Sequence, residues 1–113
     1  MNILVLGGGT FGTAIANELS VNTENNVVLF SRNQQKVDEI NTYYTNKHYF
    51  PNKHLTKFLS ATSDKNEIRK ADIVFIALPS PVIIENLLML QSYFNKDALF
   101  VNLSKGLFAE GVT

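Results

Sequence analysis

Three glycines with the spacing G-x-G-x-x-G stand near the start of the chain, at Gly7, Gly9 and Gly12. They follow the apolar residues 3–6 directly and precede a segment with helical periodicity, the context that gives this common pattern its meaning. In a strand–turn–helix unit the first glycine permits the tight turn, the second lets the backbone approach a pyrophosphate, and the third allows close helix–sheet packing. The spacing predicts a dinucleotide-binding loop; a glycine-rich turn without a ligand is the alternative.

The helix expected after this loop adds a second feature that favours an anion. Its first backbone N–H groups, near Thr10 and Phe11, have no partner within the helix. These donors and the helix dipole both attract negative charge. We therefore expect a phosphate-binding site at Thr10 and Phe11.

The end of the second predicted strand indicates which dinucleotide is bound. NAD-dependent enzymes place an Asp or Glu there to accept a hydrogen bond from the ribose 2′-hydroxyl. This chain has Ser31, Arg32 and Asn33 instead. A guanidinium donates in a planar fork to phosphate oxygens, so Arg32 favours the 2′-phosphate of NADPH over NADH. A solvated surface arginine is the alternative.

Two more candidates follow later strands, where the carboxyl ends of parallel strands form a ligand crevice. Pro79 comes after the apolar residues 73–78, and Lys105 comes after the apolar residues 99–101. Pro79 either contacts the cofactor or only starts the next helix. Lys105 either pairs with a substrate phosphate, polarises a carbonyl, or is a solvated charge.

The polar loop over residues 46–56 contains two histidines and two aromatic residues of interest. His48 and His54 have no partners at metal-ligand spacing, so we expect solvated side chains and no metal site. Tyr49 or Phe50 could instead fold over the adenine ring and stack on it.

Strand-like and helical segments alternate along the whole chain. The predicted strands are residues 3–6, 27–30, 58–62, 73–78 and 99–101; the predicted helices are residues 10–19, 34–43, a brief one over 63–69, and one that begins near Pro79 or Pro81. Ala14, Ile15 and Leu19 would form the buried face of the first helix, and Val37, Ile40 and Tyr44 that of the second. The alternation predicts an α/β fold: a doubly wound parallel sheet (Rossmann fold) in three layers, α/β/α.

Size and composition are those of one soluble globular domain, so with the glycine loop we expect a single dinucleotide-binding domain over residues 1–113. Ten basic residues balance ten acidic residues, which disfavours nucleic acid and anionic membranes as partners. The chain has no cysteine, as expected of a cytoplasmic protein without disulfides, and no apolar stretch long enough for a bilayer. The alternation of strands and helices stops abruptly within residues 106–113, so we expect a trimmed piece of a longer protein.

Four elements in order resemble the bacterial type of NAD(P)-dependent glycerol-3-phosphate dehydrogenase. Residues 7–14 are similar to the family's G-x-G-(Ser/Asn/Thr)-aromatic-G-(Thr/Ser)-A opening, and residues 46–51 to its Asn-x-x-Tyr-Leu-Pro, with Phe50 in place of Leu. Residues 71–80 resemble its Ala-Asp-hydrophobic strand followed by Pro-Ser, and residues 102–107 its Lys-Gly-hydrophobic element. Together they cover nearly the whole chain.

The resemblance implies hydride transfer between NADPH or NADH and a small-molecule substrate, dihydroxyacetone phosphate. The product, sn-glycerol 3-phosphate, would serve phospholipid synthesis. Thr10, Phe11, Arg32 and Tyr49 would contact the cofactor, and Lys105 would contact both the nicotinamide region and the substrate as the catalytic residue. The family's general acid/base lysine and its phosphate-binding residues belong to an all-helical C-terminal domain outside this chain. The full-length protein could be a homodimer.

Two alternatives remain open from the sequence. One is the cofactor domain of another relative of 6-phosphogluconate dehydrogenase, such as a ketopantoate reductase, which shares the glycine loop. The other is a stand-alone nucleotide-sensing Rossmann module, which would use the loop without needing Lys105.

Overall fold

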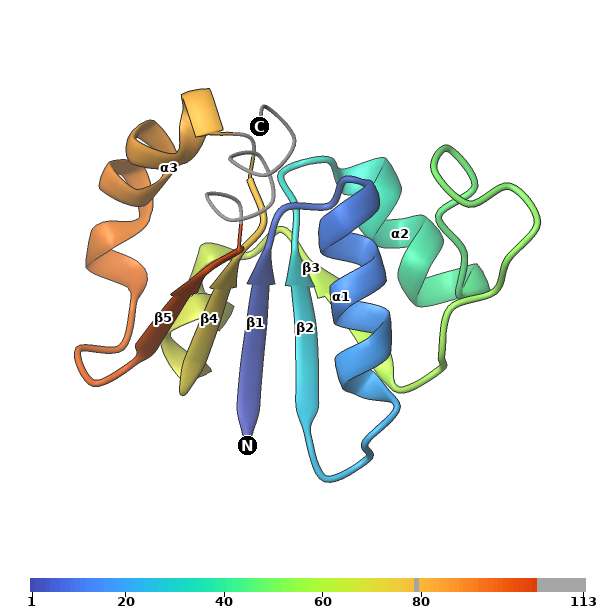
Figure 1. Cartoon of the computed structure of the whole chain (residues 1–113), viewed down its shortest axis with the longest axis horizontal. Helices are drawn as coiled ribbons and strands as arrows, with labels where there is room; N and C mark the ends of the chain where they lie inside the picture. The colour runs from blue at the N-terminus through green and yellow to red at the C-terminus, as the bar shows by residue number, and fades with distance from the viewer. Residues whose placement is uncertain (79, 104–113) are drawn as a thin grey trace, which may run out of the picture.

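A computed structural model describes residues 1–78 and 80–103, which form one five-stranded parallel sheet. The strands are β1 (Asn2–Leu6), β2 (Asn26–Phe30), β3 (Leu59–Thr62), β4 (Ile73–Ile76) and β5 (Leu99–Asn102). Their order in space is β3-β2-β1-β4-β5, so the chain builds outward from β1 in one direction and then in the other. All five arrows point the same way in Figure 1. Their carboxyl ends therefore meet at one edge of the sheet.

Helices cover both faces of the sheet, which confirms the predicted three-layer α/β/α arrangement. The helices are α1 (Thr10–Ser20), α2 (Gln34–Tyr43) and α3 (Ile83–Leu90), and three short 3-10 helices are η1 (Lys65–Lys70), η2 (Ser80–Val82) and η3 (Gln91–Tyr93). Strand residues Val5 and Leu29 pack with α1 and α2 on one face. Their neighbours Leu4 and Leu6 pack with η1 and α3 on the other. Successive side chains of a strand alternate between the faces, so each strand contributes to both cores.

The buried face of α1 differs from the sequence expectation. Ala14 is exposed, and Ile15 and Leu19 are only half-buried. The residues that are buried are small or polar: Gly12, Thr13, Ala16, Asn17 and Ser20. Small side chains allow the helix to lie close to the sheet, and this close approach outweighs the apolar periodicity.

Helix α2 has the bounds predicted from the sequence, residues 34–43, and Asn33 caps its first turn. The Asn33 side chain accepts a hydrogen bond from the backbone N–H of Lys36 at 3.2 Å. Val37 and Ile40 are buried as expected. Tyr44 instead adopts the left-handed conformation, with φ of 56°, and its side chain is exposed. This backbone conformation ends the helix and turns the chain into the loop that follows.

Helix α2 also closes one edge of the sheet through Asn41. Its side-chain amide donates to the Ala61 carbonyl at 2.9 Å and accepts from the Ala61 N–H at 2.8 Å. Ala61 lies in β3, the outermost strand on that side. The amide therefore occupies backbone groups that would otherwise be open to another strand.

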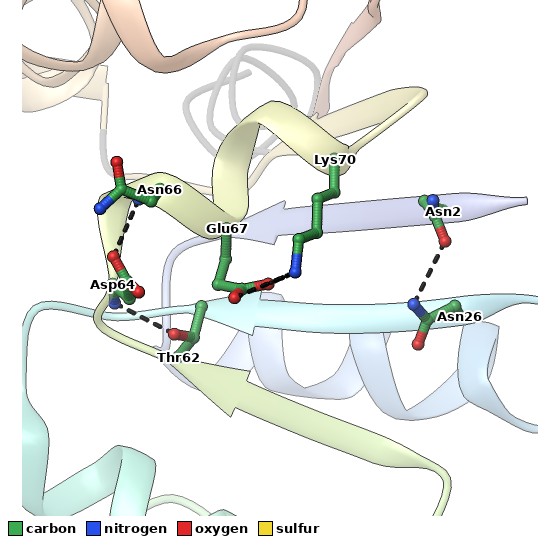
Figure 2. A network of polar contacts seen from close by, with 7 residues as sticks. All are labelled: Asn2, Asn26, Thr62, Asp64, Asn66, Glu67 and Lys70. Atoms are coloured by element: carbon green, nitrogen blue, oxygen red, sulfur yellow. Dashed lines mark hydrogen bonds and ion pairs between the residues drawn. The ribbon is translucent and has the colours of Figure 1, made fainter.

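The brief helix predicted between β3 and β4 is present as the 3-10 helix η1. Asp64 caps it, accepting from the backbone N–H of Asn66 at 2.9 Å, and its own N–H donates to the Thr62 hydroxyl at 3.0 Å. Figure 2 shows these contacts beside the ion pair of Glu67 with Lys70, 2.9 Å long. Figure 2 also shows the Asn26 amide donating to the Asn2 side chain across the first residues of β1 and β2.

The helix predicted to start near Pro79 or Pro81 is divided in three, as η2, α3 and η3. Leu90 is buried in the core on this face of the sheet, and the half-buried residues Ile83, Leu87, Tyr93 and Phe94 pack against the same core. No helix in residues 1–78 and 80–103 is long and apolar enough to cross a membrane.

Candidate dinucleotide-binding site

The glycine loop turns sharply at the carboxyl end of β1. Gly7 has φ of +116°, a conformation that side-chain-bearing residues rarely adopt, and its N–H donates to the Phe30 carbonyl at 3.2 Å. A Cβ on Gly7 would lie 2.6 Å from the Ala77 carbonyl oxygen, after β4. A Cβ on Gly12 would lie 1.8 Å from the Gly7 carbonyl oxygen. The protein's own backbone therefore requires both glycines, as the sequence predicts.

Gly9, the middle glycine, has a different environment. It is the residue before α1 and has extended backbone angles, φ −79° and ψ −166°, which any residue can adopt. The nearest atom to a Cβ built there is the Tyr49 hydroxyl oxygen, 4.0 Å away. The fold itself leaves room for a side chain at Gly9, so the reason for a glycine must be sought in a ligand.

The first turn of α1 has donors available at the same place. No side chain caps this helix. Among the described residues, no hydrogen bond uses the backbone N–H of Thr10, Phe11 or Gly12. Thr10 is exposed and Phe11 half-buried. These N–H groups and the open space beside Gly9 form a site that suits a phosphate group.

A pocket of about 200 Å³ opens beside the loop, where the carboxyl ends of β1, β2 and β4 face α3. It is lined by Leu6, Gly7, Gly8, Phe30, Ser31, Arg32, Leu78, Val82, Glu85, Asn86 and Leu90. The floor is mostly apolar and the rim carries charges of both signs. The chain passes from β1 to one face and from β4 to the other, which makes this the topological switch point where ligands bind in such sheets.

Arg32 lines this pocket and is exposed, as its predicted role requires. Its guanidinium lies toward α3, with Nη1 3.9 Å from the Met89 sulfur. The end of β2 carries no carboxylate, as its sequence shows, but Glu85 in the first turn of α3 lines the same pocket. Sequence reasoning could not find Glu85, because only the packing of α3 across the sheet edge brings it opposite Arg32.

Tyr49 lies on the other side of the loop from this pocket. Its ring is 4.7 Å from the Lys36 ammonium nitrogen, and its hydroxyl is the group nearest to Gly9. Tyr49 does not line the pocket that holds Phe30 and Arg32. The structure therefore brings Tyr49 beside Gly9 and does not place it for stacking on a ring in the pocket.

Asn46 is completely buried and ties the loop of Tyr49 to the glycine loop. Its side-chain amide donates to the Thr13 hydroxyl at 3.0 Å and to the Gly8 carbonyl at 3.4 Å. Its backbone carbonyl accepts from the N–H groups of Tyr49 and Phe50 at 3.1 and 2.8 Å. The start of α1, the glycine loop and Tyr49 are thus held together by one side chain. In the sequence, this contact corresponds to the Asn-x-x-Tyr element. The pattern alone does not reveal that its asparagine joins the two loops.

Of the remaining residues singled out from the sequence, Pro79 and Lys105 lie outside the described residues. His48 and His54 are exposed, as expected, and no group of acidic residues and histidines in residues 1–78 and 80–103 could hold a metal ion.

The parallel sheet order, the glycine loop and the pocket at the switch point define the Rossmann class of nucleotide-binding domains. A family profile described as the N-terminus of NAD-dependent glycerol-3-phosphate dehydrogenase matches residues 2–113. The chain belongs to this family, as the resemblance of its four sequence elements implied.

Individual relatives agree with the family assignment. The chain is 37% identical over 106 residues to a glycerol-3-phosphate dehydrogenase [NAD(P)+] of Staphylococcus carnosus, covering 93% of this chain and 32% of that protein. It is 38% identical over 110 residues to the enzyme of that name from Acinetobacter baylyi, covering 96% of this chain and 30% of that protein. The chain therefore spans about a third of the length of these curated relatives.

Solved structures share the fold at lower identity. A glycerol-3-phosphate dehydrogenase from Saccharomyces cerevisiae superposes with a TM-score of 0.80 at 21% identity, over 90% of this chain and 33% of that one. An arogenate dehydrogenase from Synechocystis gives a TM-score of 0.70 at 19% identity, over 90% and 32%. Because dehydrogenases of different substrates share this fold, the family assignment rests on the sequence matches.

Proposed function

We propose that this chain binds NADPH or NADH at the carboxyl edge of its sheet, as the cofactor domain of a glycerol-3-phosphate dehydrogenase. The observation that carries the proposal is the space beside Gly9. A Cβ there would meet nothing closer than 4.0 Å, although the flanking Gly7 and Gly12 are tightly enclosed. A pyrophosphate that lies close to Gly9 and accepts hydrogen bonds from the free N–H groups of α1 would explain both the glycine and the uncapped helix.

Each part of the cofactor has a corresponding surface. The pyrophosphate would accept hydrogen bonds from the N–H groups of Thr10 and Phe11, with the Tyr49 hydroxyl beside it. The adenine would enter the apolar pocket between Phe30 and Leu78, and the Arg32 guanidinium at its rim would donate to a 2′-phosphate. Pro79 would border the cofactor after β4.

The whole protein would interconvert dihydroxyacetone phosphate and sn-glycerol 3-phosphate, a precursor of phospholipids, in the cytoplasm. When bound, the nicotinamide would supply the hydride. Lys105 would hold the substrate phosphate or polarise its carbonyl next to the nicotinamide. We propose no nucleic acid partner for the protein, and a homodimer as the state of the full-length protein.

Titration of the 113-residue chain with NADPH and NADH, followed by cofactor fluorescence or calorimetry, tests the binding proposal. The chain has no tryptophan, so its own emission does not interfere strongly with nicotinamide fluorescence. We expect a Kd on the order of 10–500 μM for the preferred cofactor, because only one wall of the site is present to exclude water. Absence of saturable binding of both cofactors would overturn the proposal.

A further inference from the structure

Lys36 reaches the glycine loop from the first turn of α2. A Cβ built on Gly8 would meet Lys36 Cδ at 3.0 Å and the Ser31 hydroxyl oxygen at 3.2 Å. Beyond this contact the Lys36 ammonium lies 4.7 Å from the centre of the Tyr49 ring. The half-buried lysine chain therefore crosses the end of β2 and brings its charge between Ser31 and Tyr49.

No ion pair neutralises this charge within the described part of the chain, although Glu39 lines the same surface cavity and interacts with the charge of Lys36. The ion pair found there joins Lys70 to Glu67, and no carboxylate lies within 4.0 Å of the Lys36 ammonium. Glu39 is the nearest candidate, one turn along α2. Its Oε2 instead accepts from the Thr45 hydroxyl at 2.7 Å and from the Lys47 N–H at 2.8 Å.

The position of Lys36 is also unfavourable for the helix. It is in the first turn of α2, which contains no acidic residue, and the positive end of a helix dipole repels a cation. The Tyr49 ring offsets only part of this cost. A half-buried cation that forms no ion pair within the described residues and lies in the first turn of a helix favours an anionic ligand.

Building on the proposed function, we propose that Lys36 is a specificity-determining residue that binds the 2′-phosphate of NADPH. The phosphate would lie over Gly8, with Arg32 on the α3 side and Lys36 on the α2 side. The Ser31 hydroxyl supports this, because it accepts from the Asn33 N–H at 3.2 Å and donates to no described residue. Glu85 lines the pocket of Arg32, and Glu39 lines the surface cavity of Lys36 and Tyr49, where its Oε2 is held by hydrogen bonds from Thr45 and Lys47.

The pyrophosphate is the competing ligand for Lys36, because the Lys36 ammonium lies over Tyr49, whose hydroxyl is the group nearest to Gly9. The free donors for the pyrophosphate are at Gly9 and the start of α1, whereas the Lys36 chain packs on Gly8 and Ser31 at the end of β2. That strand end is where the adenosine ribose lies in Rossmann domains. NADPH and NADH differ only in the 2′-phosphate, so comparing them separates the two assignments.

The test uses Lys36→Met, which keeps the length of the side chain on Gly8 and removes the charge. We expect NADPH to bind about 10- to 100-fold more weakly and NADH to change less than about twofold, as for loss of a charge-assisted hydrogen bond. Lys36→Arg should recover most of the NADPH affinity. Lys65→Met is the matched control, because the Lys65 ammonium also lies over a tyrosine ring, 5.8 Å from that of Tyr93, but away from the loop.

Three different outcomes would overturn the assignment of Lys36 to the 2′-phosphate of NADPH. Equal weakening of both cofactors by Lys36→Met would assign the lysine to the pyrophosphate. An unchanged affinity for NADPH would make it a structural or solvated side chain. Binding of neither cofactor to the unaltered chain would overturn the proposed function and the role of Lys36 with it. Thermal unfolding of each variant verifies that the affinities refer to folded protein.

Discussion

The glycines of the first loop are required for different reasons. Gly12 packs against the Gly7 carbonyl, so the fold excludes any side chain there. Gly9 has open space and ordinary backbone angles, so the fold tolerates a side chain there. Substitution of each glycine by alanine therefore distinguishes folding from binding.

We expect Gly12→Ala to destabilise the domain by roughly 2–4 kcal/mol, because the new methyl group would overlap a backbone oxygen that cannot move freely. Gly9→Ala should change the free energy of unfolding by less than about 0.5 kcal/mol and weaken both cofactors at least about tenfold. Denaturant unfolding and cofactor titration of both variants measure these effects. A Gly9→Ala variant with full affinity would show that the pyrophosphate lies elsewhere.

Arg32→Ala should weaken NADPH about 10- to 100-fold, since a charge-assisted bond to phosphate contributes roughly 1.5–3 kcal/mol. NADH lacks the phosphate and should lose little. The quantity to measure is the ratio of the two dissociation constants in the variant and in the unaltered chain. An unchanged ratio would make Arg32 a solvated charge at the rim of the pocket.

Glu39 gives the domain a defined response to acid. Partial burial opposes its ionisation, but the hydrogen bonds from Thr45 and Lys47 and the charges of Lys47 and Lys36 outweigh burial and lower its pKa below 4.5. A carboxyl whose pKa is lower in the folded state stabilises the fold above its unfolded pKa, and this contribution is lost as the pH falls through the folded pKa.

Glu39→Gln should therefore reduce the free energy of unfolding at neutral pH. The difference from the unaltered chain should shrink as the pH falls below about 4.5 and vanish once both forms are neutral. Denaturant unfolding over a range of pH measures this difference. A difference that stays constant into strong acid would show that the charge of Glu39 has no part in it.

At the scale of elements, the sequence predicted all five strands of the described residues and the helices α1, α2, η1 and α3, but not the division of the last helix into η2, α3 and η3. The apolar runs and the glycine, proline and asparagine signals between them were sufficient for this. The burial of α1 could not be predicted, because Gly12, Thr13 and Asn17 are buried by proximity to the sheet and not by hydrophobicity. In the same way, Arg32 was found from its strand end, but Lys36, Asn46 and Glu85 reach the site only through tertiary packing.

Asn41→Ala tests how α2 holds the edge strand. The substitution removes one donor and one acceptor from the Ala61 backbone, and we expect a loss of about 1–3 kcal/mol. Thr42→Ala, at the exposed next position of the same helix, is the control and should change the stability by less than about 0.5 kcal/mol. Equal stabilities of the two variants would show that the amide contributes nothing to the edge.

For the whole molecule, we expect binding without turnover from residues 1–113. The glycine loop and the pocket lie within the chain, whereas general acid/base chemistry needs a positioned proton donor within hydrogen-bond reach of the substrate. The resemblance assigns that group to a part of the relatives beyond the third that this chain spans. Measurable reduction of dihydroxyacetone phosphate by the chain, followed by loss of NADPH absorbance, would contradict this expectation.

The amide of Asn41 also restricts which edge of the sheet can pair with a strand from another molecule. Strands that pair between molecules need an open edge, and the edge at β3 is occupied. Within the described residues, the outer side of β5 bears no further strand. Asn41 thus disfavours, at the β3 edge, the strand pairing between molecules that leads to aggregation.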